Sequence, residues 1–192
     1  MLFYPIHESH LSFSHKLCKQ QLTYGSFVVD ATAGNGKDSL FLANLILKEN
    51  KGHLWSLDIQ EKAITNTKKI LEENLDKQLI KNISLINQCH SLPLPSSPSL
   101  DLVVYNLGYL PGGNKKLCTK TNTTLLSIRY FLKLLKQEGA LCITCYPGHE
   151  EGAEEYYFLL RFFQFNISPY WKITHYFHPN KPQAPNIFWI SN

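Results

Sequence analysis

Residues 26–38 of the chain read SFVVDATAGNGKD, and this stretch decides the fold. Its first half is a short run of β-branched and apolar residues, which is typical of a buried strand. The strand ends at Asp30 and runs directly into a turn with Gly34 and Gly36, after which a helical pattern begins. Glycine suits this turn because it tolerates left-handed backbone and lets the chain approach a ligand closely. The order of strand, glycine turn and helix therefore predicts a small-molecule site at the turn.

The rest of the chain repeats the alternation of strand and helix. Six further runs of β-prone residues lie at 53–58, 82–87, 101–106, 140–146, 170–177 and 186–191. Helical periodicity lies between most of them, most clearly at 60–75 and 121–137. This order predicts an α/β fold with a mostly parallel seven-stranded sheet and helices on both faces. The crossover at 91–99 is too rich in proline for a full helix, and the last two strands are expected to be antiparallel because their connection is short.

Composition places the chain among compact globular proteins. It has 192 residues, 44% hydrophobic and 18% charged, so we expect one domain spanning 1–192 and exclude disorder and fibrous repeats. No apolar run approaches the roughly 20 residues of a membrane span, and no secretory leader is visible, so a cytoplasmic location is expected. The five scattered cysteines are expected to be reduced. The formal net charge of +4 permits a polyanionic partner without requiring one.

No metal site is expected in this chain. Cys142 and Cys145 form a CxxC inside an apolar strand pattern, and no second CxxC exists to complete a zinc site. His175 and His178 lie three residues apart on a predicted strand, where their side chains would point to opposite faces.

A carboxylate at the end of the second strand indicates which class of ligand the glycine turn binds. Asp58 lies 22 residues after Gly36, where an acidic side chain accepts hydrogen bonds from ribose hydroxyls. Nicotinamide dinucleotides use a related turn with a third glycine, but this chain has Ser39 there. Asp30, expected to stand beside the turn, would repel a pyrophosphate and suit a cationic amine. The pattern favours S-adenosylmethionine, which has a sulfonium, an ammonium and no phosphate, although a nicotinamide-dependent oxidoreductase remains the alternative.

Several motifs together resemble a known family. They are DATAGNGKD at 30–38, FLA at 41–43, LDIQ at 57–60, CHS at 89–91, NLGYLPGG at 106–113, TTL at 123–125 and YPGHEEG at 146–152. In this order and spacing they are similar to the small class I (Rossmann-like) methyltransferases once labelled putative rRNA methylases and since assigned to 5-aminomethyluridine at the tRNA wobble position. The resemblance covers nearly the whole chain, and NLGYLPGG is its most specific part.

The resemblance implies a site for S-adenosylmethionine after the first three strands. Its residues would be Asp30, Gly34, Asn35, Gly36, Lys37, Asp58, Gln60, Cys89 and His90. Asn35 and Lys37 would contact the methionine part of the cofactor. Asp58 and Gln60 would bind the ribose and the adenine edge, and the pair at 89–90 the adenine rim. For His90 alone, an ordinary loop histidine is the alternative interpretation.

The resemblance also implies an acceptor site after the fourth strand. Asn106 opens NLGYLPGG, at the position where amine-modifying methyltransferases carry an Asn-Pro-Pro-Tyr-like loop. Its side-chain oxygen would accept a hydrogen bond from an amine, and Tyr109 would stack on a base. His149 is the candidate for taking a proton from the amine, with helix capping as its alternative role. We name Asn106, Tyr109 and His149 as the candidate catalytic residues.

The expected partner is tRNA, bound at its anticodon region, and the oligomeric state is left open, with a homodimer as one option. Basic residues near the acceptor loop are expected to contact the phosphates. They are Lys115, Lys116 and Lys120, with Arg129, Lys133 and Lys136 on the following helix. Methylation of rRNA and a non-catalytic RNA-binding module stay as alternative functions.

Overall fold

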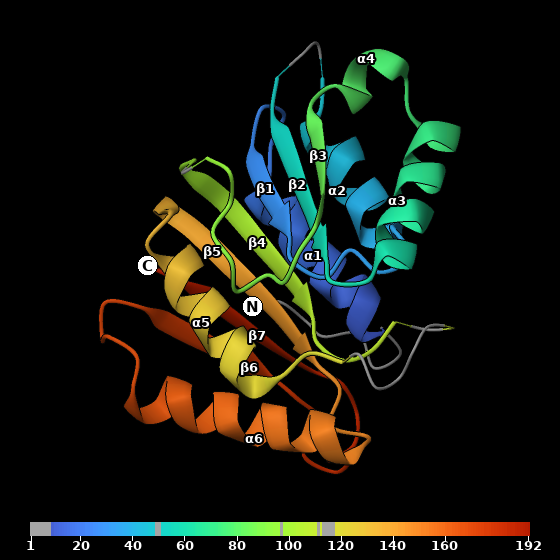
Figure 1. The fold of residues 1–192 in the computed structure, drawn as a ribbon. Coiled ribbons are helices and arrows are strands. Elements are labelled where there is room, and N and C mark those ends of the chain that lie inside the picture. Colours follow the sequence, from blue (N-terminus) through green and yellow to red (C-terminus); the bar gives the residue numbers. More distant parts are fainter. Residues whose placement is uncertain (1–8, 49–50, 97, 111, 113–117) are drawn as a thin grey trace.

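The fold is built on one sheet with the strand order β3-β2-β1-β4-β5-β7-β6 (Figure 1). The structure is a computed structural model that describes residues 9–48, 51–96, 98–110, 112 and 118–192. The strands are β1 (Phe27–Asp30), β2 (His53–Asp58), β3 (Ile83–Asn87), β4 (Leu100–Asn106), β5 (Leu135–Cys145), β6 (Lys172–Tyr176) and β7 (Asn186–Ser191). Neighbouring strands from β3 to β5 pair in parallel, whereas β7 is antiparallel to both β5 and β6. The predicted sheet and its antiparallel C-terminal strands are confirmed.

Helices cover both faces of the sheet. They are α1 (His10–Gln21), α2 (Lys37–Ile46), α3 (Glu61–Asn74), α4 (Lys77–Ile80), α5 (Thr121–Leu132) and α6 (Glu150–Phe165). Figure 1 shows α1, α2 and α3 on one face, and α5 and α6 on the other. As predicted, the described residues between β3 and β4 contain no helix. No helix of the described residues is both long and apolar enough to cross a bilayer.

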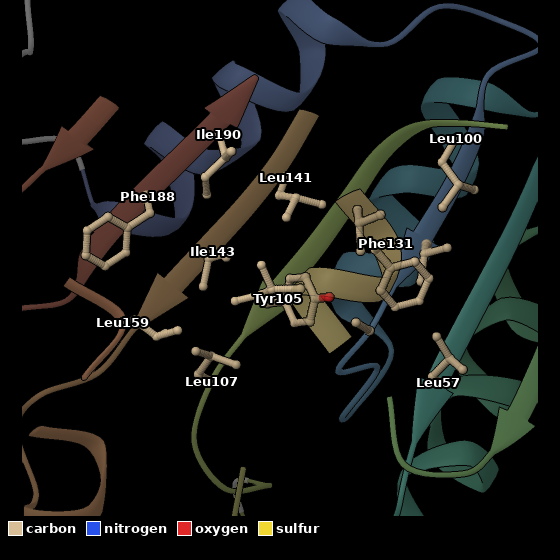
Figure 2. Close-up of a cluster of buried hydrophobic side chains, with 14 of the residues drawn as sticks. Leu57, Leu100, Tyr105, Leu107, Phe131, Leu141, Ile143, Leu159, Phe188 and Ile190 are labelled. Carbon is tan, nitrogen blue, oxygen red and sulfur yellow. The ribbon is translucent and has the colours of Figure 1, made fainter. Parts of the chain in front are cut away.

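Each face of the sheet has its own hydrophobic core, so the central strands are apolar on both sides. Val28 packs in the core under α1, α2 and α3, while its neighbour Val29 packs in the core under α5 and α6. Figure 2 shows the second core, in which Tyr105 and Phe131 are fully buried. Cys142 and Cys145 are both buried but belong to different cores, and two side chains on opposite faces of one strand cannot share a metal ion.

The helix expected over 121–137 is shorter than predicted. It ends at Leu132, and β5 begins at Leu135, which pairs with Leu100 of β4. The register then shifts, Glu138 takes a left-handed φ of 66°, and the main pairing resumes at Ala140. The apolar residues read as the last helical turn therefore begin an irregular strand. Helices α1 and α4 were not predicted from the sequence.

Candidate active site

The predicted site residues gather where the parallel strands end. Asp30 closes β1, Asp58 closes β2 and Asn106 closes β4. Because β1 lies between β2 and β4, its two neighbours are reached by crossovers that run in opposite directions. Ligands of open α/β sheets bind at such a switch point, outside the carboxyl ends of the strands.

The two glycines of the turn have different physical roles. Gly34 and Gly36 both have left-handed backbone, with φ of 55° and 79°. A Cβ on Gly34 would meet only ordinary neighbours, the nearest at 3.7 Å, so its conformation alone favours glycine. A Cβ on Gly36 would lie 2.7 Å from the Cα of Thr67 and 2.6 Å from a methyl group of Ile70. Gly36 therefore also allows the start of α2 to pack closely on α3.

Asp58 holds the glycine turn against the end of β2. Its Oδ2 accepts a hydrogen bond from the Gly34 amide at 2.9 Å, and its Oδ1 accepts one from the Gln60 amide at 2.9 Å. The side chain of Asn87 donates to the Asp58 carbonyl oxygen at 2.9 Å. Asp58 is only partly buried, and each carboxylate oxygen can accept a second hydrogen bond, so it can still accept ribose hydroxyls.

Asp30 lies beneath the turn rather than beside it, which corrects the expectation that it would face a cationic amine. It is fully buried. Its Oδ2 accepts from the Ser39 hydroxyl at 2.6 Å, and its Oδ1 from the Thr32 amide at 3.2 Å. Burial, together with the negative charge of Asp38, raises the pKa of Asp30 to about 7. Ser39 stands where a dinucleotide turn has its third glycine, and here it ties α2 to β1.

The other predicted cofactor residues surround the same turn. The Asn66 side chain donates to Asn35 Oδ1 at 2.9 Å. Lys37 is exposed at the start of α2, and Gln60 is the N-cap of α3. Cys89 Sγ lies 3.1 Å from the Ser91 hydroxyl in the loop after β3.

His90 is a buried imidazole with spare hydrogen-bonding capacity. It is 7% exposed, and its edge lies against Tyr105, with ring centroids 5.9 Å apart. Burial lowers the pKa of His90 to about 4, so the ring is neutral near pH 7. Its Nδ1 is buried without a hydrogen-bond partner among the described residues. A buried, unpaired polar atom near the expected adenine rim fits a ligand that carries ring nitrogens.

Asn106 is held on two sides. Its amide nitrogen Nδ2 donates to Asp38 Oδ2 at 2.6 Å, and its backbone N–H donates to the Thr32 hydroxyl at 2.7 Å. Tyr146, just after β5, places its hydroxyl 3.5 Å from Asn106 Oδ1. No role was predicted for Asp38 or Tyr146, although they belong to the motifs at 30–38 and 146–152. Asp38 could have been found from the sequence, because it is a carboxylate in the first turn of a helix that follows a predicted binding loop.

Two histidines of α1 complete this cluster, and no sequence motif pointed to them. His15 Nε2 lies 2.7 Å from Asp38 Oδ1, and the His15 ring stacks on Phe41 with centroids 3.6 Å apart. His10 Nε2 lies 3.2 Å from the Tyr146 hydroxyl. Burial lowers the pKa of His10 and raises that of Tyr146 to about 12, so both are neutral near pH 7.

A buried carboxylate anchors the acceptor loop. Thr119 accepts a hydrogen bond from the Gly108 amide at 2.9 Å and donates its hydroxyl to Glu155 Oε2 at 2.6 Å. The Thr124 hydroxyl donates to the other oxygen of Glu155 at 2.6 Å. Gly108 has a φ of 143°, and among the described residues no atom lies within 4 Å of a Cβ built there.

The other two candidate catalytic residues lie close to each other. Tyr109 is 40% exposed, and its ring centroid is 5.6 Å from that of His149. His149 is the N-cap of α6, where its Nδ1 accepts a hydrogen bond from the Gly152 amide at 3.1 Å. The same Nδ1 lies 3.3 Å from Glu151 Oε2, so both of these neighbours belong to the start of α6. The structure therefore favours the capping role of His149 over the general base that we had expected.

The members of the predicted basic patch on and after α5 lie away from the acceptor loop. Lys115 and Lys116 lie outside the described residues. Lys136 forms an ion pair with Asp101 at 2.8 Å, near the start of β4 and thus at the opposite end of the sheet from Asn106. Lys133 follows the C-terminal end of α5, which is also away from the acceptor edge. The Arg129 guanidinium lies over the Phe162 ring, 5.3 Å from its centroid. Lys120, exposed at the start of α5, is the described member of the patch that remains near the acceptor loop.

A sheet that ends in an antiparallel β7 and β6, with its site at a switch point next to β1, is the architecture of the class I, S-adenosylmethionine-dependent methyltransferases. Solved structures agree. A putative rRNA-methylase from Clostridium thermocellum has a TM-score of 0.86 and 30% identity, covering 99% of both chains. SMU.1697c, a putative methyltransferase from Streptococcus mutans solved in complex with SAH, has a TM-score of 0.78 and 27% identity, covering 99% of this chain and 98% of the other.

Comparison with protein families is more specific. The family described as "Putative rRNA methylase" matches residues 54–192, and the chain belongs to this family. A curated relative, the chloroplastic tRNA (mnm(5)s(2)U34)-methyltransferase of Arabidopsis thaliana, is 34% identical over an alignment of 148 residues that covers 74% of this chain. The matched region spans 54%, about half, of the length of that relative.

Proposed function

We propose that the protein is an S-adenosylmethionine-dependent N-methyltransferase of RNA, and that its acceptor is the amine of 5-aminomethyl(-2-thio)uridine at the tRNA wobble position. The observation that carries the proposal is the pairing of Asn106 with Asp38 at the end of β4. The name of the Arabidopsis relative and the SAH complex of the Streptococcus relative support the substrate and the cofactor, respectively.

The residues after β1, β2 and β3 suit this cofactor. Asp58 offers only acceptors, which ribose hydroxyls require. Gly34 and Gly36 let the backbone of the turn approach the cofactor closely, and the neutral His90 has a ring nitrogen without a hydrogen-bond partner among the described residues. When bound, S-adenosylmethionine supplies a methyl group on a positively charged sulfur.

The residues of the acceptor half suit an aliphatic amine. Asn106 Oδ1 and the carbonyl oxygen of Leu107 would accept N–H hydrogen bonds and so aim the nitrogen lone pair. The Asp38 carboxylate next to Asn106 favours a group that carries or develops positive charge, which an amine does and a ring amide does not. The exposed ring of Tyr109 would stack on the uracil. Orientation of this kind can contribute up to roughly 7–11 kcal/mol to lowering the barrier.

An rRNA acceptor is the second candidate, because the family and two solved relatives are named as rRNA methylases. The acceptors differ in charge. An aliphatic amine carries positive charge near pH 7, whereas an exocyclic base amine or a ribose hydroxyl of rRNA does not. The two candidates are therefore separable by substrate.

The test is a panel of RNA substrates with methyl-labelled S-adenosylmethionine. The purified protein would be incubated with tRNA carrying 5-aminomethyl(-2-thio)uridine, with the same tRNA lacking that group, and with rRNA. We expect label only in the aminomethylated tRNA. Label in rRNA, or equal labelling of both tRNA samples, would refute the proposed substrate.

A further inference from the structure

Helix α1 enters the acceptor half of the site, although it contains none of the motifs that define the family resemblance. His15 Nε2 contacts Asp38 Oδ1 at 2.7 Å, and Asp38 Oδ2 accepts from Asn106 Nδ2 at 2.6 Å. The three side chains thus form a continuous chain from α1, through the first turn of α2, to the end of β4. His15 and Asp38 are 26% and 17% exposed, so the chain lies near the rim of the site.

The donor and acceptor chemistry of this chain fixes the direction of the Asn106 amide. An ionised carboxylate only accepts hydrogen bonds, so Asp38 must face a donor on each side. On one side the donor is His15 Nε2, which therefore carries a proton. On the other side it is Asn106 Nδ2, because the opposite amide orientation would place its carbonyl oxygen against the carboxylate. Asn106 Oδ1 is consequently turned away from Asp38 and toward the side where Tyr146 lies.

We propose that Asp38 and His15 are positioning residues for methyl transfer, which hold the Asn106 amide with its oxygen aimed at the acceptor amine. This inference rests on the proposed function, because it assigns Asn106 Oδ1 to the amine. Asp38 orients Asn106 directly. His15 acts through Asp38, and the stacking of its ring on Phe41 restricts its own rotation.

The chief rival explanation is that the His15–Asp38 contact merely attaches α1 to the domain. Other contacts already do so: Phe13, Leu17 and Cys18 are buried under the sheet. At the opposite end of α1, Gln21 donates to the carbonyl oxygen of Glu138 at 2.7 Å. Gln21→Ala is thus a matched control that removes a hydrogen bond of α1 without touching the Asn106 cluster.

The experiment compares Asp38→Ala, His15→Ala, His15→Gln and Gln21→Ala with the parent protein. Single-turnover methyl transfer to aminomethylated tRNA and the affinity for S-adenosylmethionine would be measured for each. We expect a loss of roughly 100-fold in rate for Asp38→Ala, because misplacement of a reacting group by about 1 Å costs this much. His15→Ala should lose about tenfold, as expected for a hydrogen bond to a charged group. Gln carries a donor at similar reach, so His15→Gln should recover most of that loss.

A second measurement does not depend on any substrate. The side-chain NH₂ signals of Asn106, assigned by their absence in Asn106→Ala, report its hydrogen bond to Asp38. We expect the parent and Gln21→Ala to share a downfield amide proton that Asp38→Ala loses and that His15→Ala shifts. Cofactor affinity should stay within about threefold of the parent value in all four variants, a difference under roughly 0.7 kcal/mol.

The outcomes separate the inference from the proposed function. The positioning roles would be overturned if Asp38→Ala and His15→Ala lost turnover while the Asn106 signals stayed unchanged, or if the signals moved while turnover stayed unchanged. An equal rate loss in Gln21→Ala would overturn them as well. If the parent protein methylates no aminomethylated tRNA, the proposed function fails. In that case the amide signals still decide whether Asp38 and His15 hold Asn106.

Discussion

The two halves of the proposed site, one for the cofactor and one for the acceptor amine, are built in different ways. The cofactor half is local in the sequence: one turn at 34–36 and the ends of two consecutive strands supply most of it. The acceptor half joins residues from α1, α2, β4 and the end of β5, with Tyr146 and His10 separated by 136 positions. A local half can be read from a motif, whereas a half assembled over long range is visible only once the chain has folded. The same division predicts that the two halves can be damaged independently.

Asn106→Ala is expected to give the largest difference between the loss of methyl transfer and the loss of cofactor affinity. Removal of the side chain leaves the acceptor amine without its principal partner, so methyl transfer should fall by about 10²–10³-fold, as for loss of a donor that stabilises a transition state. Calorimetry should find the affinity for S-adenosylmethionine nearly intact, because the side-chain hydrogen bonds of Asn106 are to Asp38 and Tyr146, on the acceptor side. Full turnover in this variant would remove Asn106 from the acceptor site.

The converse change is Asp58→Ala in the cofactor half. It removes the proposed ribose contacts and also the hydrogen bonds to the Gly34 and Gln60 amides. We expect the Kd for S-adenosylmethionine to rise roughly 100-fold, about 3 kcal/mol, with the methyl-transfer rate largely recovered at saturating cofactor. Asp76→Ala, at the start of the distant α4, is the control. A Kd within threefold of the parent value would show that Asp58 does not bind the ribose.

Asp30→Asn tests whether Asp30 belongs to the scaffold beneath the turn. Because the folded-state pKa of about 7 lies above the unfolded value near 3.9, the folded protein binds the extra proton between these pH values. The parent should therefore lose stability, up to roughly 4 kcal/mol, as the pH rises from about 4 to 7. The variant should lack this component. Urea unfolding at pH 5 and pH 8 measures the difference, and parallel pH dependence in the two proteins would contradict the buried carboxylate.

The smallest expected effect concerns the RNA. Lys120 is the described basic residue that remains near the acceptor loop, and Lys133 follows the far end of the same helix. If Lys120 contacts one phosphate, Lys120→Ala should flatten the slope of log affinity against log salt by about 0.7–0.9, and Lys133→Ala should not change it. Equal slopes for all three proteins would place the RNA elsewhere on the surface.

Sequence patterns predicted the parts of the molecule whose signals are local. Alternating apolar runs located all seven strands, and the short link between the runs at 170–177 and 186–191 predicted the antiparallel end of the sheet. The full burial of Asp30 was not predicted, because it depends on the packing of α2, whose Ser39 donates a hydrogen bond to the Asp30 carboxylate. His149 was predicted to be a proton acceptor because it follows the fifth strand. Its hydrogen bond with the Gly152 amide, which makes it the N-cap of α6, could not be predicted from that position. Leu135 fitted a helical face as well as a strand, and only its pairing with Leu100 decides between them.

α1 was the largest omission, and its cause is physical. Its sequence, HLSFSHKLCKQQ, has mixed polarity and short apolar spacing, so helical periodicity is weak there. The helix is stabilised mainly by packing on the sheet, a long-range effect that single-sequence reasoning does not capture. The same packing brings His10 to Tyr146 and His15 to Asp38.

The most direct test of the proposed function is where the methyl group goes. Aminomethylated tRNA would be incubated with the protein and S-adenosylmethionine carrying a deuterated methyl group, digested to nucleosides and fragmented in a mass spectrometer. We predict that the label stays with the base and is lost together with the side-chain amine of the modified uridine. Label on the ribose, or on a ring atom of any base, would contradict an acceptor site built around Asn106.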